Sequence, residues 1–181
     1  MYKIAKEFDF CYGHRVWSQE LNCDFSLDSC LKCRHLHGHQ GKLIIYLEAE
    51  KLEKGMVTDF KHLNWVKKFI DDVLDHKFIM DLNDPIIDHE VPIMRALRDA
   101  DSLEKYPEGY YLIPNPTSWD LNPAVGEKYE GLVFVDFVPT SENLSKWIFD
   151  IVQEKMRKIN IAVSRVQLYE TPKSQSNYFN H

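Results

Sequence analysis

Histidine and cysteine side chains gather in one short stretch of the sequence, Cys33-Arg34-His35-Leu36-His37-Gly38-His39. Successive residues of a strand point to opposite faces, so His37 and His39 would share a face and bind one metal ion together. An earlier segment that ends in Gly13-His14 offers a third imidazole. Three histidine ligands leave the fourth position of a zinc ion open, which is typical of catalytic sites. The residues therefore predict a catalytic Zn²⁺ site on His14, His37 and His39.

Other interpretations of the same residues remain open at this point. Cys30 and Cys33 form a C-x-x-C pair close to His35, which is compatible with a non-enzymatic zinc-knuckle binding module. The pair lacks a second well-spaced C-x-x-C or H-x3-H partner. A His-x-His pair on a strand can also belong to a solvated face. For Cys11 and Cys23 we expect buried, small apolar side chains without chemistry.

Three further segments carry acids beside groups that could move protons or bind a substrate. Asp75 and His76 follow a predicted helix, and from these residues alone a helix-end histidine beside a solvated acid is the simpler interpretation. Glu170 closes a predicted strand, and its two oxygens would match the paired N–H donors of an aminopyrimidine, although an ordinary exposed glutamate fits equally. The run Thr140-Ser141-Glu142 has the pattern of a helix start.

The elements that must position these residues follow from hydrophobic periodicity. Residues 2–10 and 38–50 read as strands that can pair around an irregular loop, 11–36, and residues 60–74 have the spacing of an amphipathic helix with Asp59 as its N-cap. A second helix opens at Thr140 or Ser141, and strands are predicted at 131–137, 161–170 and 175–180. The order predicts an α+β fold with the helices on one face of an antiparallel sheet. We expect a single domain, 1–181, with an insertion, 84–138, between the two helices.

Composition narrows the class of protein. Hydrophobic residues make up 44% of the 181 residues, which is enough for a packed core. The formal net charge is −6 with no long basic run, so we expect no nucleic-acid partner. The sequence has no apolar stretch of roughly 18–20 residues, and its first residues do not form a signal peptide, so we expect no membrane span and a cytoplasmic protein with reduced cysteines.

Six short motifs, in this order along the chain, resemble the 6-pyruvoyl-tetrahydropterin synthase and 6-carboxy-tetrahydropterin synthase superfamily. They span nearly the whole chain apart from the insertion. The motifs are Phe8-x5-His14-Arg15, Cys33-x3-His37-Gly38-His39, Gly55-Met56-Val57-x-Asp59-Phe60, Leu74-Asp75-His76, Pro139-Thr140-Ser141-Glu142-Asn143 and Tyr169-Glu170-Thr171.

The resemblance implies a tunnelling fold of ββααββ subunits that assemble into a homo-oligomer, usually a hexamer, with active sites between subunits. It implies zinc on the three histidines and Cys33 as the proton-transfer residue, assisted by Asp75 and His76 of a neighbouring subunit. It also implies that Glu170 anchors the pterin ring of a pterin triphosphate substrate. The segment of Thr140, Ser141 and Glu142 would help to bind it.

Cysteine spacing separates the branches of the superfamily. Three residues stand between Cys33 and His37, which resembles the bacterial 6-carboxy-tetrahydropterin synthases of queuosine biosynthesis; the animal-type pyruvoyl synthases tend to have five. The implied reaction is a lyase reaction that converts 7,8-dihydroneopterin triphosphate to 6-carboxy-5,6,7,8-tetrahydropterin with release of acetaldehyde and triphosphate. A 6-pyruvoyl-tetrahydropterin synthase is the closest alternative, and a zinc hydrolase is a more distant one. The residues Cys11-Tyr12-Gly13 depart from the small residues usual before the first histidine, and the long insertion exceeds the connection in compact members.

Overall fold

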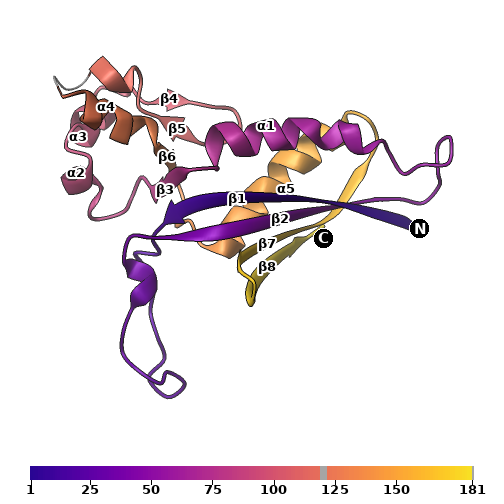
Figure 1. Ribbon diagram of the computed structural model, residues 1–181, viewed down its shortest axis with the longest axis horizontal. Helices are drawn as coiled ribbons and strands as arrows, with labels where there is room; N and C mark the ends of the chain where they lie inside the picture. Colours follow the sequence, from indigo (N-terminus) through magenta and orange to yellow (C-terminus); the bar gives the residue numbers. More distant parts are fainter. Residues whose placement is uncertain (119–121, 181) are drawn as a thin grey trace. The chain divides into compact units, whose positions relative to one another are not determined.

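The computed structural model describes residues 1–118 and 122–180 of the chain (Figure 1). The chain divides into two compact units. Residues 1–12, 39–75 and the chain from residue 140 onward form the first unit, and residues 13–38 and 76–139 form the second. No helix among the described residues has both the length and the apolar character that crossing a membrane requires.

The first unit is built on long strands that pair in the order β1-β2-β7-β8. Strand β2 pairs with β7 in antiparallel register, with Lys42 opposite Tyr169, and β7 pairs with β8 in the same sense. Alternate side chains of β2 fill the core, because Leu43, Ile45 and Leu47 are fully buried while the residues between them are more exposed. The strands are β1 (Tyr2–His14), β2 (His37–Ala49), β7 (Ala162–Thr171) and β8 (Ser174–Phe179).

Two helices cover this sheet. A 3-10 turn, η2 (Phe60–Leu63), leads into α1 (Asn64–Val73), and α5 (Ser141–Arg157) packs along β7 and β8 (Figure 1). The helices contact each other where the rings of Phe69 and Trp147 meet edge to face, with centroids 5.7 Å apart. This is the predicted α+β arrangement, with helices packed on one face of an antiparallel sheet.

The second unit has a core of its own. Strand β3 pairs in parallel with β6, and β5 pairs antiparallel to both β6 and β4. Buried apolar side chains from β3, β6 and the short helices between them pack into one cluster that includes Met80, Met94, Leu97 and Phe134. The elements are η1 (Lys32–Arg34), β3 (Lys77–Asp81), α2 (Ile87–Glu90), α3 (Met94–Asp99), β4 (Glu104–Lys105), β5 (Tyr111–Leu112), η3 (Pro116–Ser118), α4 (Pro123–Glu130) and β6 (Leu132–Val135).

The structure corrects the predicted elements in three places. Strand β1 continues to His14, so residues 11–14 are strand and not part of an irregular loop. The predicted helix 60–74 begins as a 3-10 turn, and Asp59 is its N-cap because the Asp59 side chain accepts a hydrogen bond from Lys61 N–H. Strand β3 was not predicted, and the insertion holds several short helices and strands besides β6, which lies within the predicted strand 131–137. The single-domain assignment of 1–181 stays a prediction, and residues 119–121 and 181 lie outside the described part of the chain.

Candidate metal centre

The three predicted histidines stand at the ends of two long strands. His14 is the last residue of β1, and His37 opens β2. His39 follows two residues later in the same strand, so its ring lies on the same face as that of His37. The rings of His14 and His37 have centroids 4.6 Å apart. One ring nitrogen from each histidine lies within 4.8 Å of the other two, so the cluster could hold a metal ion.

Main-chain carbonyls orient two of the three rings. His14, which is only 1% exposed, places Nδ1 2.6 Å from the carbonyl oxygen of Pro139. His37 places Nδ1 2.7 Å from the carbonyl oxygen of His35. A carbonyl can only accept a hydrogen bond, so each Nδ1 carries the proton and donates it. The proton is thereby fixed on Nδ1, and Nε2 keeps the lone pair that a metal ion requires.

The donor set suits a tetrahedral metal ion. In a zinc site with Zn–N bonds of about 2.0–2.1 Å, ligand nitrogens are about 3.4 Å apart. The three ring nitrogens here lie within 4.8 Å of one another. Small rotations of the rings would bring them to the separation of a zinc site. Neutral imidazoles are ligands for zinc, copper, iron and nickel, so the residues fit a zinc ion but do not by themselves select it.

Packing explains the glycine in the run Cys11-Tyr12-Gly13 before the first histidine. A Cβ atom built at this position would lie 2.4 Å from Cδ2 of Phe78 and 3.3 Å from the carbonyl oxygen of His37. Contacts below 3.0 Å are not tolerated without a shift of the neighbours, so the close packing of Phe78 beside β1 requires glycine immediately before His14.

Cys33 lies in the short turn η1 and is half-buried. Its main-chain N–H donates to Oε1 of Gln19 at 3.0 Å, and its carbonyl accepts from Val16 N–H at 2.7 Å. Both main-chain polar groups of Cys33 are therefore held by the segment that follows His14. Of the residues that the structure describes, the group with metal-ligand spacing consists of the three histidines and includes neither Cys33 nor Cys30, which favours the histidine site over the zinc knuckle.

The expectation of buried, inert side chains at Cys11 and Cys23 is wrong, since both are exposed. Cys11 stands in β1 between Phe10 and Tyr12, whose buried side chains take the core face and leave Cys11 on the other face. Cys23 lies in the loop between β1 and β2. Cys30 in the same loop is exposed as well, and its N–H donates to Oδ1 of Asp28.

Asp75 and His76 follow the end of α1. Helix α1 ends at Val73, and the N–H groups of Leu74 and Asp75 both donate to the carbonyl of Ile70. Oδ1 of Asp75 accepts a hydrogen bond from Cys11 N–H at 2.8 Å, so this carboxylate is fixed to β1. His76 is exposed and adopts a left-handed backbone, with φ of 57°, before β3 begins. The proton-transfer roles assigned to this pair stay predictions.

Glu170 is half-buried in β7, and its negative charge interacts electrostatically with the hydroxyl of Tyr12 in β1. Burial raises the pKa of the Tyr12 hydroxyl, and the negative charge of Glu170 raises that pKa further, so the tyrosine stays protonated. Thr140 is the N-cap of α5, because its Oγ1 accepts from Asn143 N–H at 3.2 Å. The carbonyl of Ser141 accepts from Oγ of Ser176 at 2.7 Å.

The segment Thr140, Ser141 and Glu142 therefore begins α5, as its pattern indicated, and Glu142 lies exposed in the first turn. The substrate-binding roles of these three residues and of Glu170 stay predictions.

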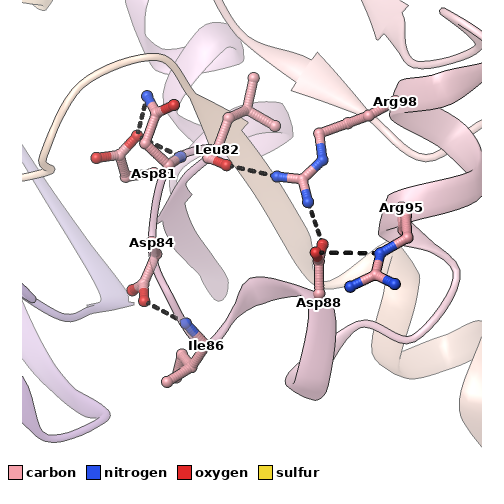
Figure 2. Close-up of polar contacts among 8 residues, drawn as sticks. Asp81, Leu82, Asp84, Ile86, Asp88, Arg95 and Arg98 are labelled. Carbon is pink, nitrogen blue, oxygen red and sulfur yellow. Dashed lines mark hydrogen bonds and ion pairs between the residues drawn. The ribbon is translucent and has the colours of Figure 1, made fainter.

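Two buried acids, one at the end of β3 and one at the first residue of the insertion, were not identified from the sequence. Asp81 and Asp84 are each 2% exposed. Asp81 accepts from Nε1 of Trp17 at 2.8 Å, and Oδ2 of Asp84 lies 3.0 Å from Nε of Arg15. Figure 2 shows both carboxylates beside the turn that leads to Ile86. The spacing Asp-x-x-Asp after an apolar strand was the available signal, but an acidic turn is too common for that signal to indicate a function.

The chain is similar to known proteins along nearly its whole length. A family model described as 6-pyruvoyl tetrahydropterin synthase matches residues 3–181. A protein of Aquifex aeolicus named 6-carboxy-5,6,7,8-tetrahydropterin synthase is 31% identical over 98% of this chain and 97% of its own length. The crystal structure of an uncharacterized protein from Wolinella succinogenes is 50% identical, with a TM-score of 0.93 over 99% of this chain and 98% of that one.

A more distant structure shares the fold. The 6-pyruvoyl tetrahydropterin synthase of Caenorhabditis elegans superposes with a TM-score of 0.56 at 19% identity, over 99% of this chain and 96% of that one. The expected tunnelling fold is thereby confirmed. The match of the family model over nearly the whole chain, together with the Aquifex aeolicus relative, shows that the chain belongs to the 6-pyruvoyl tetrahydropterin synthase family.

Proposed function

We propose that the protein is a zinc-dependent 6-carboxy-5,6,7,8-tetrahydropterin synthase. With the uptake of one water molecule, it converts 7,8-dihydroneopterin triphosphate to 6-carboxy-5,6,7,8-tetrahydropterin and releases acetaldehyde and triphosphate. The observation that carries the proposal is the cluster of His14, His37 and His39, with two rings oriented by carbonyls. It stands in a chain similar along its whole length to proteins named for this activity.

The metal and the thiol have separate tasks in this proposal. When bound to the three histidines, zinc supplies Lewis acidity towards the oxygens of the substrate side chain. Cys33 takes up and returns a proton at Sγ, which requires the thiol to lie close to the reacting carbon. Its half-buried position in η1, with both main-chain groups bonded, supports this role because a proton-transfer group must be held in place.

Asp75 and His76 assist the proton transfer. The exposed ring of His76 can serve a Cys33 thiol in a neighbouring copy of the chain, which accords with the interfacial active sites implied by the family resemblance. Asp75 is anchored to Cys11 N–H, so it fixes the turn that carries His76. This role of His76 requires a homo-oligomer, and the family resemblance leads us to propose a hexamer.

Recognition of the pterin falls to Glu170. A carboxylate offers two oxygens to the two parallel N–H donors of an aminopyrimidine edge. Because Tyr12 beside Glu170 stays protonated and neutral, it does not reduce the negative charge that the carboxylate presents to the pterin. The start of α5, with Thr140, Ser141 and Glu142, contributes further polar groups to substrate binding.

The branch of the family determines the product. The three residues between Cys33 and His37 favour the carboxy-type enzymes of queuosine biosynthesis. The relatives from Aquifex aeolicus and Haemophilus influenzae carry the carboxy-type name, which supports the same choice.

The decisive experiment incubates the zinc-loaded protein with 7,8-dihydroneopterin triphosphate and identifies the products by mass spectrometry. We expect 6-carboxy-5,6,7,8-tetrahydropterin and one acetaldehyde per turnover. Formation of 6-pyruvoyl-tetrahydropterin without acetaldehyde would assign the protein to the pyruvoyl type. Release of phosphate with the pterin side chain otherwise intact, and equal release by Cys33→Ala, would identify a hydrolase.

A further inference from the structure

Asp81, at the end of β3, and Asp84, at the start of the insertion, contact the chain segment that links His14 to Cys33. Asp84 pairs with Arg15, and both side chains are largely buried, at 1% and 14% exposed. Asp81 accepts from the indole N–H of Trp17. A buried carboxylate is unfavourable unless it is paired, and here Asp84 is paired by charge with Arg15 without hydrogen-bond geometry between Nε and Oδ2, whereas Asp81 is held by a directed hydrogen bond.

The acids are themselves fixed by the turn that carries them. Oδ1 of Asp81 accepts from the main-chain and side-chain N–H groups of Asn83, at 2.9 and 3.1 Å. Oδ1 of Asp84 accepts from Ile86 N–H at 3.0 Å (Figure 2). The second oxygen of each acid is thereby aimed at the segment after His14. Two contacts, two residues apart on that segment, resist both its displacement and its rotation.

The same segment holds Cys33 by its main chain. Val16, between the two residues that the acids contact, donates its N–H to the Cys33 carbonyl, and Gln19 accepts from Cys33 N–H. The bond between Gln19 and Cys33 is reinforced by a further contact, in which Nε of Arg34 donates to the Gln19 carbonyl at 2.9 Å. The ion pair of Asp84, the hydrogen bond of Asp81 and the bonds that Val16 and Gln19 make to Cys33 thus connect the two acids, through residues 15–19, to the turn that carries the thiol.

We infer that Asp81 and Asp84 are positioning residues for Cys33, which act through Arg15, Trp17 and Val16. The inference rests on the proposed function for the role of the thiol. It gives the turn from β3 into the insertion a part in catalysis through the position of the thiol.

The experiment compares Asp84→Asn, Trp17→Phe and a matched control, Asp88→Asn. Asp88 belongs to the same stretch of the insertion, but its partners Arg95 and Arg98 are also in the insertion (Figure 2). Trp17→Phe removes the indole N–H and keeps an aromatic ring, so it tests the contact with Asp81 while the Asp81 carboxylate keeps its hydrogen bonds from Asn83. If Asp84→Asn does not fold, the result for Trp17→Phe alone tests the inference.

Two readouts are measured on the zinc-loaded oligomer. The first is the rate of Cys33 alkylation by iodoacetamide, followed by peptide mass spectrometry with exposed Cys11 as the internal reference. The second is the separation of kcat from KM. We expect Asp84→Asn and Trp17→Phe to accelerate alkylation of Cys33 about tenfold, because thiol access increases when the turn loosens. We expect kcat to fall about 10- to 100-fold with KM unchanged, as for misplaced catalytic groups. Asp88→Asn should leave both quantities at wild-type values.

Wild-type alkylation and kcat in Trp17→Phe and in folded Asp84→Asn would overturn the inference. Equal changes in Asp88→Asn would also overturn it, since they would reflect a general loosening of the insertion. The alkylation rate does not depend on pterin chemistry. If the wild-type protein fails to convert 7,8-dihydroneopterin triphosphate, the proposed function fails while the alkylation data still decide the positioning role.

Discussion

Replacement of His37 by alanine is the sharpest test of the metal centre. His14 is buried, so its removal would leave a cavity and destabilise the protein whether or not a metal is bound. His37 is only half-buried, and the carbonyl that its Nδ1 contacts is solvent-accessible enough for water to replace the ring. His37→Ala therefore changes metal binding while altering the stability of the metal-free protein very little.

The expected magnitude follows from linkage between binding and folding. A ligand present at 100 to 1,000 times its Kd, and bound only by the folded state, adds about 2.7–4.1 kcal/mol to the free energy of unfolding. For a chain of this length, each kcal/mol moves Tm by about 2–4 °C. Zinc should thus raise the Tm of the wild-type protein by about 5–16 °C over the chelated protein, and His37→Ala should lose this shift.

The assay is thermal unfolding with and without a chelator, together with metal analysis of the purified proteins. His35→Ala is the matched control, because it removes a neighbouring exposed imidazole and keeps the main-chain carbonyl that orients His37. We expect His35→Ala to retain about one zinc per chain and the full shift in Tm. If His37→Ala keeps both its zinc and the shift in Tm, the three-histidine site is wrong.

Four further outcomes are expected. Cys33→Ala should keep its metal and lose about 10²- to 10⁴-fold in turnover, as expected for a proton-transfer residue. The control, Cys30→Ala, should turn over at close to the wild-type rate. Loss of zinc from Cys33→Ala would favour the zinc knuckle. Cobalt-substituted protein should lack thiolate charge-transfer bands in its absorption spectrum; their presence would place Cys30 or Cys33 on the metal. Cys33→Ala and His76→Ala chains, each inactive alone, should regain activity when mixed and reassembled, and a strictly monomeric protein by light scattering would contradict this. Gly13→Ala should lower the free energy of unfolding by about 1–3 kcal/mol because its Cβ meets the ring of Phe78, and an unchanged urea midpoint would count against that packing argument.

Local patterns predicted the elements that carry the histidines. Alternation of apolar side chains placed β1, β2 and β7 to within a few residues, and the helical spacing after Asp59 placed α1. The face shared by His37 and His39 follows from strand geometry alone. The cluster with His14 could be anticipated because strands next to each other in sequence usually pair.

Contacts between distant segments could not be predicted in the same way. Strand β3 is only five residues long, directly follows α1 and pairs in parallel with β6, far along the chain, so no local periodicity indicated it. The contacts of Asp81 and Asp84 with Trp17 and Arg15 join positions more than 60 residues apart. Cys11 was misjudged because the prediction ended β1 too early and so gave the cysteine no strand face.

The carbonyl contacts of His14 and His37 have a consequence for how the site tolerates change. Both acceptors belong to the main chain, at Pro139 and His35, so substitutions of those two side chains leave the acceptors in place as long as the backbone keeps its path. A carbonyl also carries no formal charge, whereas a carboxylate in its place would offset part of the charge of a bound cation. With these neutral contacts behind neutral imidazoles, a divalent ion would keep most of its attraction for a polyphosphate, even in a chain whose net charge is −6.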